Sequence, residues 1–158
     1  MNIRKEQFGN LSVEFIKGLP FIERFTIQEY RHPSDEVSSY LITLRRSELI
    51  SDLDAFILLL ERLEYHEEEW NWNEKLVKSC RGTVLNKIFN FINKDGVCAK
   101  IDSHTLTKKI SEVDIEIDVY REITKESCNF IIFDNWNLLQ SVGRNDNTYY
   151  LFIWYTTA

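Results

Sequence analysis

Carboxylates dominate the side chains of this sequence that could do chemistry, and one cluster of them is mixed with large aromatic residues. The cluster consists of Glu67, Glu68, Glu69, Trp70 and Trp72. Carboxylates steer a basic partner, and aromatic side chains bury a large area at little rotamer cost, so the combination favours a protein-binding surface. The alternative is that the glutamates form the solvated end of a helix and the tryptophans cover the core.

A second acidic stretch, residues 112–122, alternates charged with apolar side chains. Such alternation predicts a strand with one dry face and one wet face. Its carboxylates at Asp114, Glu116 and Asp118 would then stand about 6.6 Å apart, the two-residue rise of a strand. We expect this row either to bind lysines and arginines that would otherwise contact phosphates, or to protect a sheet edge from aggregation.

The negative charge of the chain is local. The 158 residues include 25 acids and 19 bases, which gives a formal net charge of −6. Residues 61–75 and 112–122 each carry a net charge of −4, so the rest of the chain is slightly basic. This distribution argues against nucleic acid or an anionic membrane surface as the main partner and favours a basic protein.

The sequence lacks the motifs that define common reactions. His32, His66 and His104 are far apart and lack zinc-site spacing, and no phosphate-binding glycine motif occurs. We therefore expect a protein that is not an enzyme and needs no cofactor or metal. The alternatives are a small hydrolase that uses paired carboxylates and a metal, for which residues 122–125 are the nearest fragment, and a subunit of a larger assembly.

Compartment signals favour the cytoplasm. Cys80, Cys98 and Cys128 form neither a CxxC pair nor an even disulfide framework, which is typical of reduced thiols. The first residues lack the apolar segment of a signal peptide. The longest apolar runs, residues 55–60 and 149–155, are far shorter than the roughly 20 residues of a membrane span.

Two helices are predicted in the middle of the chain. Ser51 has capping spacing before an apolar stripe that continues to Leu63. A second helix is expected to begin at Asn73 and to end near Gly96. Strands are expected on both sides of this pair, at residues 11–15, 25–27, 37–44, 113–119, 128–133 and 148–155.

These elements predict one α+β domain over residues 1–158. Two central amphipathic helices would pack on a mostly antiparallel sheet of about five to seven strands. Both faces of the last strand are apolar or aromatic, which favours a central strand covered on both sides over an exposed aromatic patch.

The leading hypothesis is a cytosolic binding protein that sequesters a basic partner. Its most concrete form is a bacterial immunity protein or inhibitor that blocks a toxic nuclease by covering the nuclease's phosphate-binding site. The local charge, the interleaved tryptophans and the missing catalytic motifs motivate it.

Overall fold

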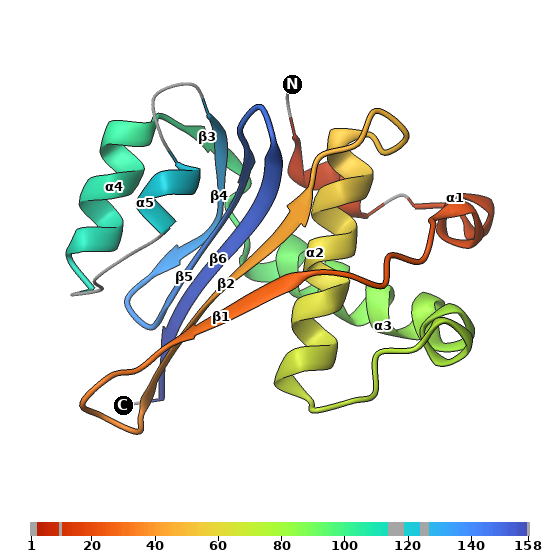
Figure 1. Cartoon of the computed structure of the whole chain (residues 1–158), viewed down its shortest axis with the longest axis horizontal. Helices are drawn as coiled ribbons and strands as arrows, with labels where there is room; N and C mark the ends of the chain where they lie inside the picture. The colour runs from red at the N-terminus through yellow and green to blue at the C-terminus, as the bar shows by residue number, and fades with distance from the viewer. Residues whose placement is uncertain (1–2, 10, 114–118, 124–126, 158) are drawn as a thin grey trace.

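A computed structural model describes residues 3–9, 11–113, 119–123 and 127–157. In this part of the chain, six antiparallel strands form a single sheet with helices on both faces (Figure 1). The strand order is β1-β2-β6-β5-β4-β3. The predicted α+β class and mostly antiparallel sheet are therefore confirmed.

The strands span β1 (Thr26–Tyr30), β2 (Val37–Arg45), β3 (Ala99–Ile101), β4 (Cys128–Asn135), β5 (Leu138–Arg144) and β6 (Thr148–Thr156). β6 is central, because it pairs with β2 on one side and β5 on the other. Leu151 on one face and Phe152 on the other are both fully buried and belong to different core clusters. The interpretation of the last strand as covered on both faces is thus confirmed.

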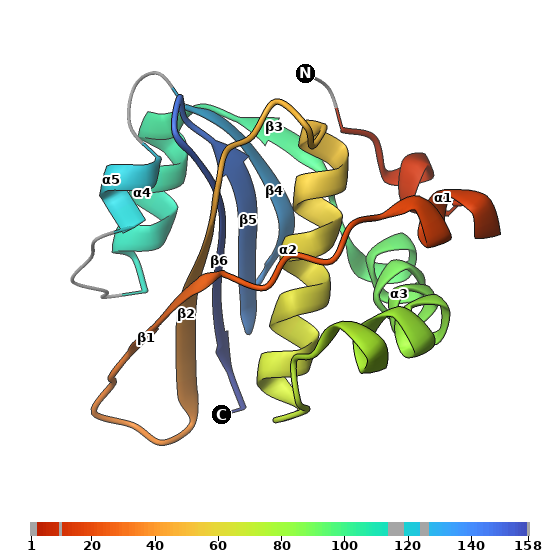
Figure 2. The same ribbon diagram turned by 45° about the vertical axis from the view of Figure 1, so that its right-hand side comes forward.

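The helices and the one 3-10 turn span η1 (Lys5–Phe8), α1 (Val13–Gly18), α2 (Asp52–Glu67), α3 (Glu74–Asp95), α4 (Ser103–Ser111) and α5 (Val119–Glu122). Figure 2 shows α4 and α5 on one face of the sheet and α2 with α3 on the other. Within the described residues, no helix is long and apolar enough to cross a membrane.

Both predicted central helices form, with the expected caps. The Ser51 hydroxyl accepts from the backbone N–H of Asp54 at 3.2 Å, and the Asn73 side chain accepts from that of Leu76 at 2.9 Å. At the end of α3, the Gly96 N–H donates to the carbonyl of Ile92 at 2.7 Å. Side-chain oxygens and a final glycine thus set the helix boundaries, as the sequence indicated.

The predicted strand at residues 11–15 is wrong. The Ser12 hydroxyl accepts from the Phe15 N–H at 3.1 Å and begins helix α1. Hydroxyl side chains can satisfy the free N–H groups of a first helical turn, and here this capping prevails over a short alternation of apolar residues.

The predicted strand at residues 113–119 is contradicted at its ends. Val113 lies in a turn after α4, and Val119 begins α5. The charged positions Asp114, Glu116 and Asp118 fall outside the described residues. The amphipathic helix α4 and the strands β3 and β5 were not predicted.

A buried ion pair connects α2 to α3. Glu61 and Arg81 are 0% and 2% exposed, and the guanidinium donates two hydrogen bonds of 2.8 Å to the two carboxylate oxygens. Arg81 also donates to the carbonyls of Leu19 and Pro20. The pair therefore fixes the segment before β1 against the two central helices.

Candidate protein-binding site

The end of α2 divides the first acidic cluster between two hollows of the surface. Glu69 has a φ of 56°, a left-handed conformation that usually selects glycine. Its N–H donates to the carbonyl of His66 at 3.2 Å, and that of Trp70 donates to the carbonyl of Tyr65 at 3.0 Å. This Schellman motif reverses the chain directly after Glu68. Glu67 and Glu68 consequently lie at one hollow, and Glu69 and Trp70 lie at another.

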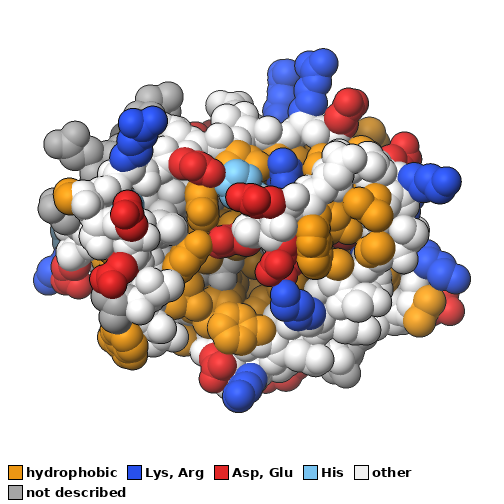
Figure 3. Space-filling model, turned by 90° about the horizontal axis from the view of Figure 1, so that it is seen from below, with side chains coloured by type: hydrophobic (Ala, Val, Ile, Leu, Met, Phe, Trp, Pro, Cys, Tyr) orange, Lys and Arg blue, Asp and Glu red, His pale blue; other side chains and the backbone are white. Residues whose placement is uncertain are grey.

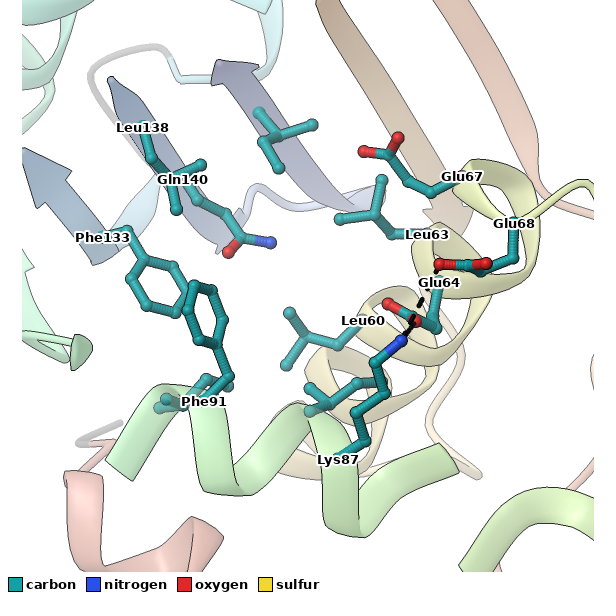
Figure 4. Close-up of a pocket in the computed structure, with 13 residues that line it drawn as sticks. Leu60, Leu63, Glu64, Glu67, Glu68, Lys87, Phe91, Phe133, Leu138 and Gln140 are labelled. Atoms are coloured by element: carbon teal, nitrogen blue, oxygen red, sulfur yellow. Dashed lines mark hydrogen bonds and ion pairs between the residues drawn. The ribbon is translucent and has the colours of Figure 1, made fainter. Parts of the chain in front are cut away.

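The first hollow, which we call the acidic groove, lies between α2, α3 and the ends of three strands. Its volume is about 350 Å³. Figure 3 shows it from below as a hollow with hydrophobic walls beside acidic side chains. Its apolar lining includes Leu60, Leu63, Phe91, Phe133, Leu138 and Ile153. Glu64, Glu67, Glu68 and Lys87 stand at its rim (Figure 4).

The rim carboxylates differ in their partners. The Lys87 ammonium lies 2.5 Å from a carboxylate oxygen of Glu64 and 3.8 Å from one of Glu68. Glu67 accepts a hydrogen bond of 2.8 Å from the Tyr155 hydroxyl, but within the described part of the chain no ion pair reaches it. Glu67 is therefore a half-buried carboxylate without a cation.

The electrostatic surroundings of Glu67 oppose its ionisation. Burial raises the pKa of Glu67 above its ordinary value of 4.5, and repulsion from Glu64 and Glu68 acts in the same direction. The Tyr155 hydrogen bond and the nearby His66 only partly offset this rise in pKa. A cation placed beside Glu67 would relieve both the repulsion and the loss of solvation.

Gln140 supplies a second polar group to the acidic groove. Its side chain is 4% exposed, and Figure 4 shows its amide directed into the open space between Leu63 and Phe133. No hydrogen bond to this amide occurs among the described residues. The amide is not among the fully buried polar atoms without a partner, so it borders the open space of the groove, where a ligand can contact it.

The second hollow lies beside the chain reversal and has a volume of about 580 Å³. Trp70 is 43% exposed there, and its ring meets that of Tyr65 edge-on at 5.4 Å. This ring contact joins the two positions that commonly form the apolar contact of a Schellman motif. Trp70 thus has a structural contact on one side and an exposed surface on the other.

The Trp72 side chain makes its contacts within the protein. Its indole N–H donates to the carbonyl of Ile22 at 3.0 Å, and its ring packs 5.1 Å from that of Tyr65. The Arg62 guanidinium lies 5.0 Å from the ring centroid. The geometry therefore favours the alternative in which this tryptophan covers the core.

The structure thus brings Glu67 and Glu68 to one site and separates them from Glu69, Trp70 and Trp72. Sequence reasoning missed three groove residues, Glu64, Lys87 and Gln140. Glu64 carried a signal, because it lies within one helical turn of Glu67 and Glu68. Lys87 comes from the next helix, α3, and Gln140 from the unpredicted strand β5, so nothing in their local sequence indicated the groove.

No protein family, curated protein or solved structure matches the chain. Among the described residues, no group of three or more His, Cys, Asp or Glu side chains is arranged to hold a metal ion. The function is therefore inferred from the geometry and charge of the surface.

Proposed function

We propose that this protein is a non-enzymatic cytoplasmic binding protein that sequesters a basic protein partner. Its most concrete form is a bacterial immunity protein or inhibitor that neutralises a toxic nuclease. The observation that carries the proposal is Glu67, a half-buried carboxylate at the rim of an apolar groove that forms no ion pair with any residue that the structure describes.

The free energy of this arrangement favours a basic partner. A desolvated carboxylate without a cation destabilises the free protein, and a partner's lysine or arginine offsets that loss on binding. The apolar groove walls add area that the partner can bury. Charge thus steers the encounter, and burial of apolar surface slows dissociation.

A nuclease suits this surface because its substrate site is basic. Proteins that bind nucleic acid contact phosphates through Lys and Arg side chains. The carboxylates of Glu64, Glu67 and Glu68 can take the place of phosphates against such side chains. Trp70, which is 43% exposed, lines the second hollow and would add an aromatic contact only to a partner that extends beyond the acidic groove.

The test compares three forms of the tagged protein as bait: the wild type, a test variant and a control variant. The test variant combines Glu64→Gln, Glu67→Gln and Glu68→Gln. The control combines Glu14→Gln, Glu48→Gln and Asp146→Asn, which remove equal charge from exposed positions that do not line the acidic groove. We expect the wild-type and control baits to retain a basic protein, released by salt, that the test variant loses. Equal capture by all three baits would contradict the proposal.

A purified partner then allows the nuclease form of the proposal to be tested. We expect the wild-type protein to inhibit DNA or RNA cleavage by that partner, and the test variant to inhibit it at least about tenfold less well, which corresponds to about 1.4 kcal/mol. A partner that requires the rim carboxylates of the acidic groove but has no nuclease activity would overturn the nuclease-inhibitor proposal and would leave the more general binding function in place.

A further inference from the structure

Two polar groups face the acidic groove without a protein partner that satisfies them. Glu67 has a hydrogen bond from Tyr155 but no cation, and Gln140 has no hydrogen bond to its amide among the described residues. One is a carboxylate at the rim, and the other is an amide held 96% inside the protein surface by the sheet. A ligand that satisfies both must be cationic and must offer several hydrogen-bond donors.

The space between these groups is small and apolar. About 350 Å³ is near the lower limit for small-molecule pockets, which suits one long side chain. Leu60 and Leu63 provide aliphatic surface for a methylene stem. Phe91 is 50% exposed, and its ring is held 4.8 Å from that of Phe133. An exposed aromatic ring of this kind can stack against a flat cation.

We propose that the acidic groove binds a single arginine side chain of the partner protein. The guanidinium donates hydrogen bonds to Glu67 and to the carbonyl oxygen of Gln140, and the stem packs on Leu60 and Leu63. This inference rests on the proposed function, because it names the side chain through which the basic partner is held.

Arginine suits the groove better than lysine. Its guanidinium presents five donors in a rigid plane, so one group can serve two acceptors on different sides. It is also less strongly hydrated than an ammonium group, which lowers the cost of moving it into an apolar space. The Phe91 ring adds a surface that a flat guanidinium can cover.

Lys87 directs the ligand to Glu67. Its ammonium is already paired with Glu64 and lies 3.8 Å from Glu68, so both carboxylates are partly neutralised in the free protein. Removing this lysine leaves three carboxylates for one incoming cation. Lys87→Gln should therefore bind arginine more tightly than the wild-type protein does.

The test is a titration of the full-length protein with three amide-capped ligands, monitored by two-dimensional NMR. The ligands are Nα-acetyl-arginine amide, the citrulline analogue, which has the same shape but no charge, and the lysine analogue. We expect arginine to shift the Gln140 side-chain amide signals together with the backbone signals of residues 60–68. Citrulline should bind at least about tenfold more weakly, and lysine about three- to tenfold more weakly.

Variants locate the binding to the acidic groove. Glu67→Gln and Gln140→Leu should each weaken arginine binding at least about fivefold, and Lys87→Gln should strengthen it at least about twofold. Glu48→Gln, in the exposed turn that precedes α2, should leave it unchanged. Glu67→Gln keeps an acceptor for the Tyr155 hydroxyl, so the fold does not depend on the charge.

Three results would overturn the inference. They are an arginine titration that leaves the Gln140 amide unmoved, citrulline or lysine binding as tightly as arginine, and an affinity that Glu67→Gln does not change. If such a result is accompanied by a basic partner that still requires the rim carboxylates, the arginine assignment fails and the proposed function stands. If the partner binds without those carboxylates, the proposed function itself fails.

Discussion

Glu61 and Glu67 are six residues apart on the same helix, and both are withdrawn from solvent, but their surroundings are opposite. Glu61 is fully buried and receives two hydrogen bonds from Arg81, which in turn binds two backbone carbonyls. Glu67 is half-buried at a groove and has a tyrosine hydroxyl but no cation among the described residues. One carboxylate is satisfied by the fold, and the other is the carboxylate that we propose pairs with a cation of the partner.

This difference separates a structural charge from the charge that we propose to be functional. Replacing one member of a satisfied buried pair leaves the other charge unpaired, so the fold loses stability. Replacing a carboxylate that has no cation removes an unfavourable group, so the fold should gain stability, and under the proposed function the partner should bind less tightly. Opposite signs of the effect on stability are therefore the signature that distinguishes these two glutamates.

Arg81→Ala should produce the largest loss of stability. It leaves the Glu61 carboxylate buried without a cation and frees the buried carbonyl of Leu19 and the partly buried carbonyl of Pro20, and we expect the free energy of unfolding to fall by about 3–5 kcal/mol. Urea denaturation measures this change. The matched control is Lys78→Ala on the same helix, whose exposed ion pair with Glu74 should contribute less than about 0.5 kcal/mol. Similar losses in the two variants would contradict the structural role of the buried pair.

Substitutions of the two tryptophans of the first acidic cluster should cause the next largest effects on stability, and the two losses should differ. Trp72→Ala removes a packed ring and orphans the carbonyl of Ile22, so it should lower the free energy of unfolding by about 2–4 kcal/mol. Trp70→Ala should lower it by less than about 1 kcal/mol, because that ring is 43% exposed. Thermal and urea unfolding of both variants test the contrast. Equal losses would show that the two rings are not differently engaged.

Glu69→Gly should stabilise the protein. A left-handed backbone conformation disfavours residues with a Cβ, so glycine at a φ of 56° should raise the free energy of unfolding by about 1 kcal/mol. Glu68→Gly is the control, because Glu68 has a right-handed φ of −84° and should lose stability on the same change. A loss of stability in both variants would contradict this interpretation of the helix end.

Glu67→Gln should raise the free energy of unfolding at neutral pH by about 0.5 kcal/mol. Burial raises the pKa of Glu67 in the folded state, so the folded protein resists ionisation more than the unfolded chain does. The contribution of Glu67 to stability is then fully present below about pH 4.5 and is lost as the pH rises through the raised pKa. The excess stability of Glu67→Gln over the wild type should therefore develop as the pH rises from about 4.5 through the raised pKa of Glu67, and it should stay constant at higher pH.

This pH dependence needs a control for the neighbouring charges. Glu64, Glu68, His66 and Lys87 lie around Glu67, and Tyr40 and Tyr155 approach from the sheet. Urea unfolding of wild type and Glu67→Gln at matched pH values isolates the difference, because the other groups titrate in both proteins. A stability difference that shrinks as the pH rises would have the wrong sign for a raised pKa.

The sequence predicted the framework of the fold well. Ser51, Asn73 and Gly96 marked the helix ends because capping is a local property, which a sequence pattern can indicate. The apolar residues on both faces of β6 correctly predicted a central strand. Ser12 shows the limit of such reasoning, because one local hydrogen bond was enough to form a helix where alternation had predicted a strand.

The candidate site was only partly predictable. Glu67 and Glu68 were identified from the local cluster of acidic and aromatic residues, but Lys87 and Gln140 join them only through tertiary packing. The strand that carries Gln140 was not predicted at all, because its Ser, Gln and Gly residues weaken a strand pattern. Sequence could therefore indicate the negative charge of the surface but not the groove beneath it.

The central claim is that the Glu67 carboxylate binds a cation of the partner. The most direct test is the pKa of the Glu67 side chain, measured by NMR titration of its carboxyl carbon. We expect a pKa above 4.5 in the free protein and a lower pKa when Nα-acetyl-arginine amide is bound, because a bound guanidinium stabilises the ionised form. A pKa at or below 4.5 in the free protein, unchanged by the ligand, would contradict the account.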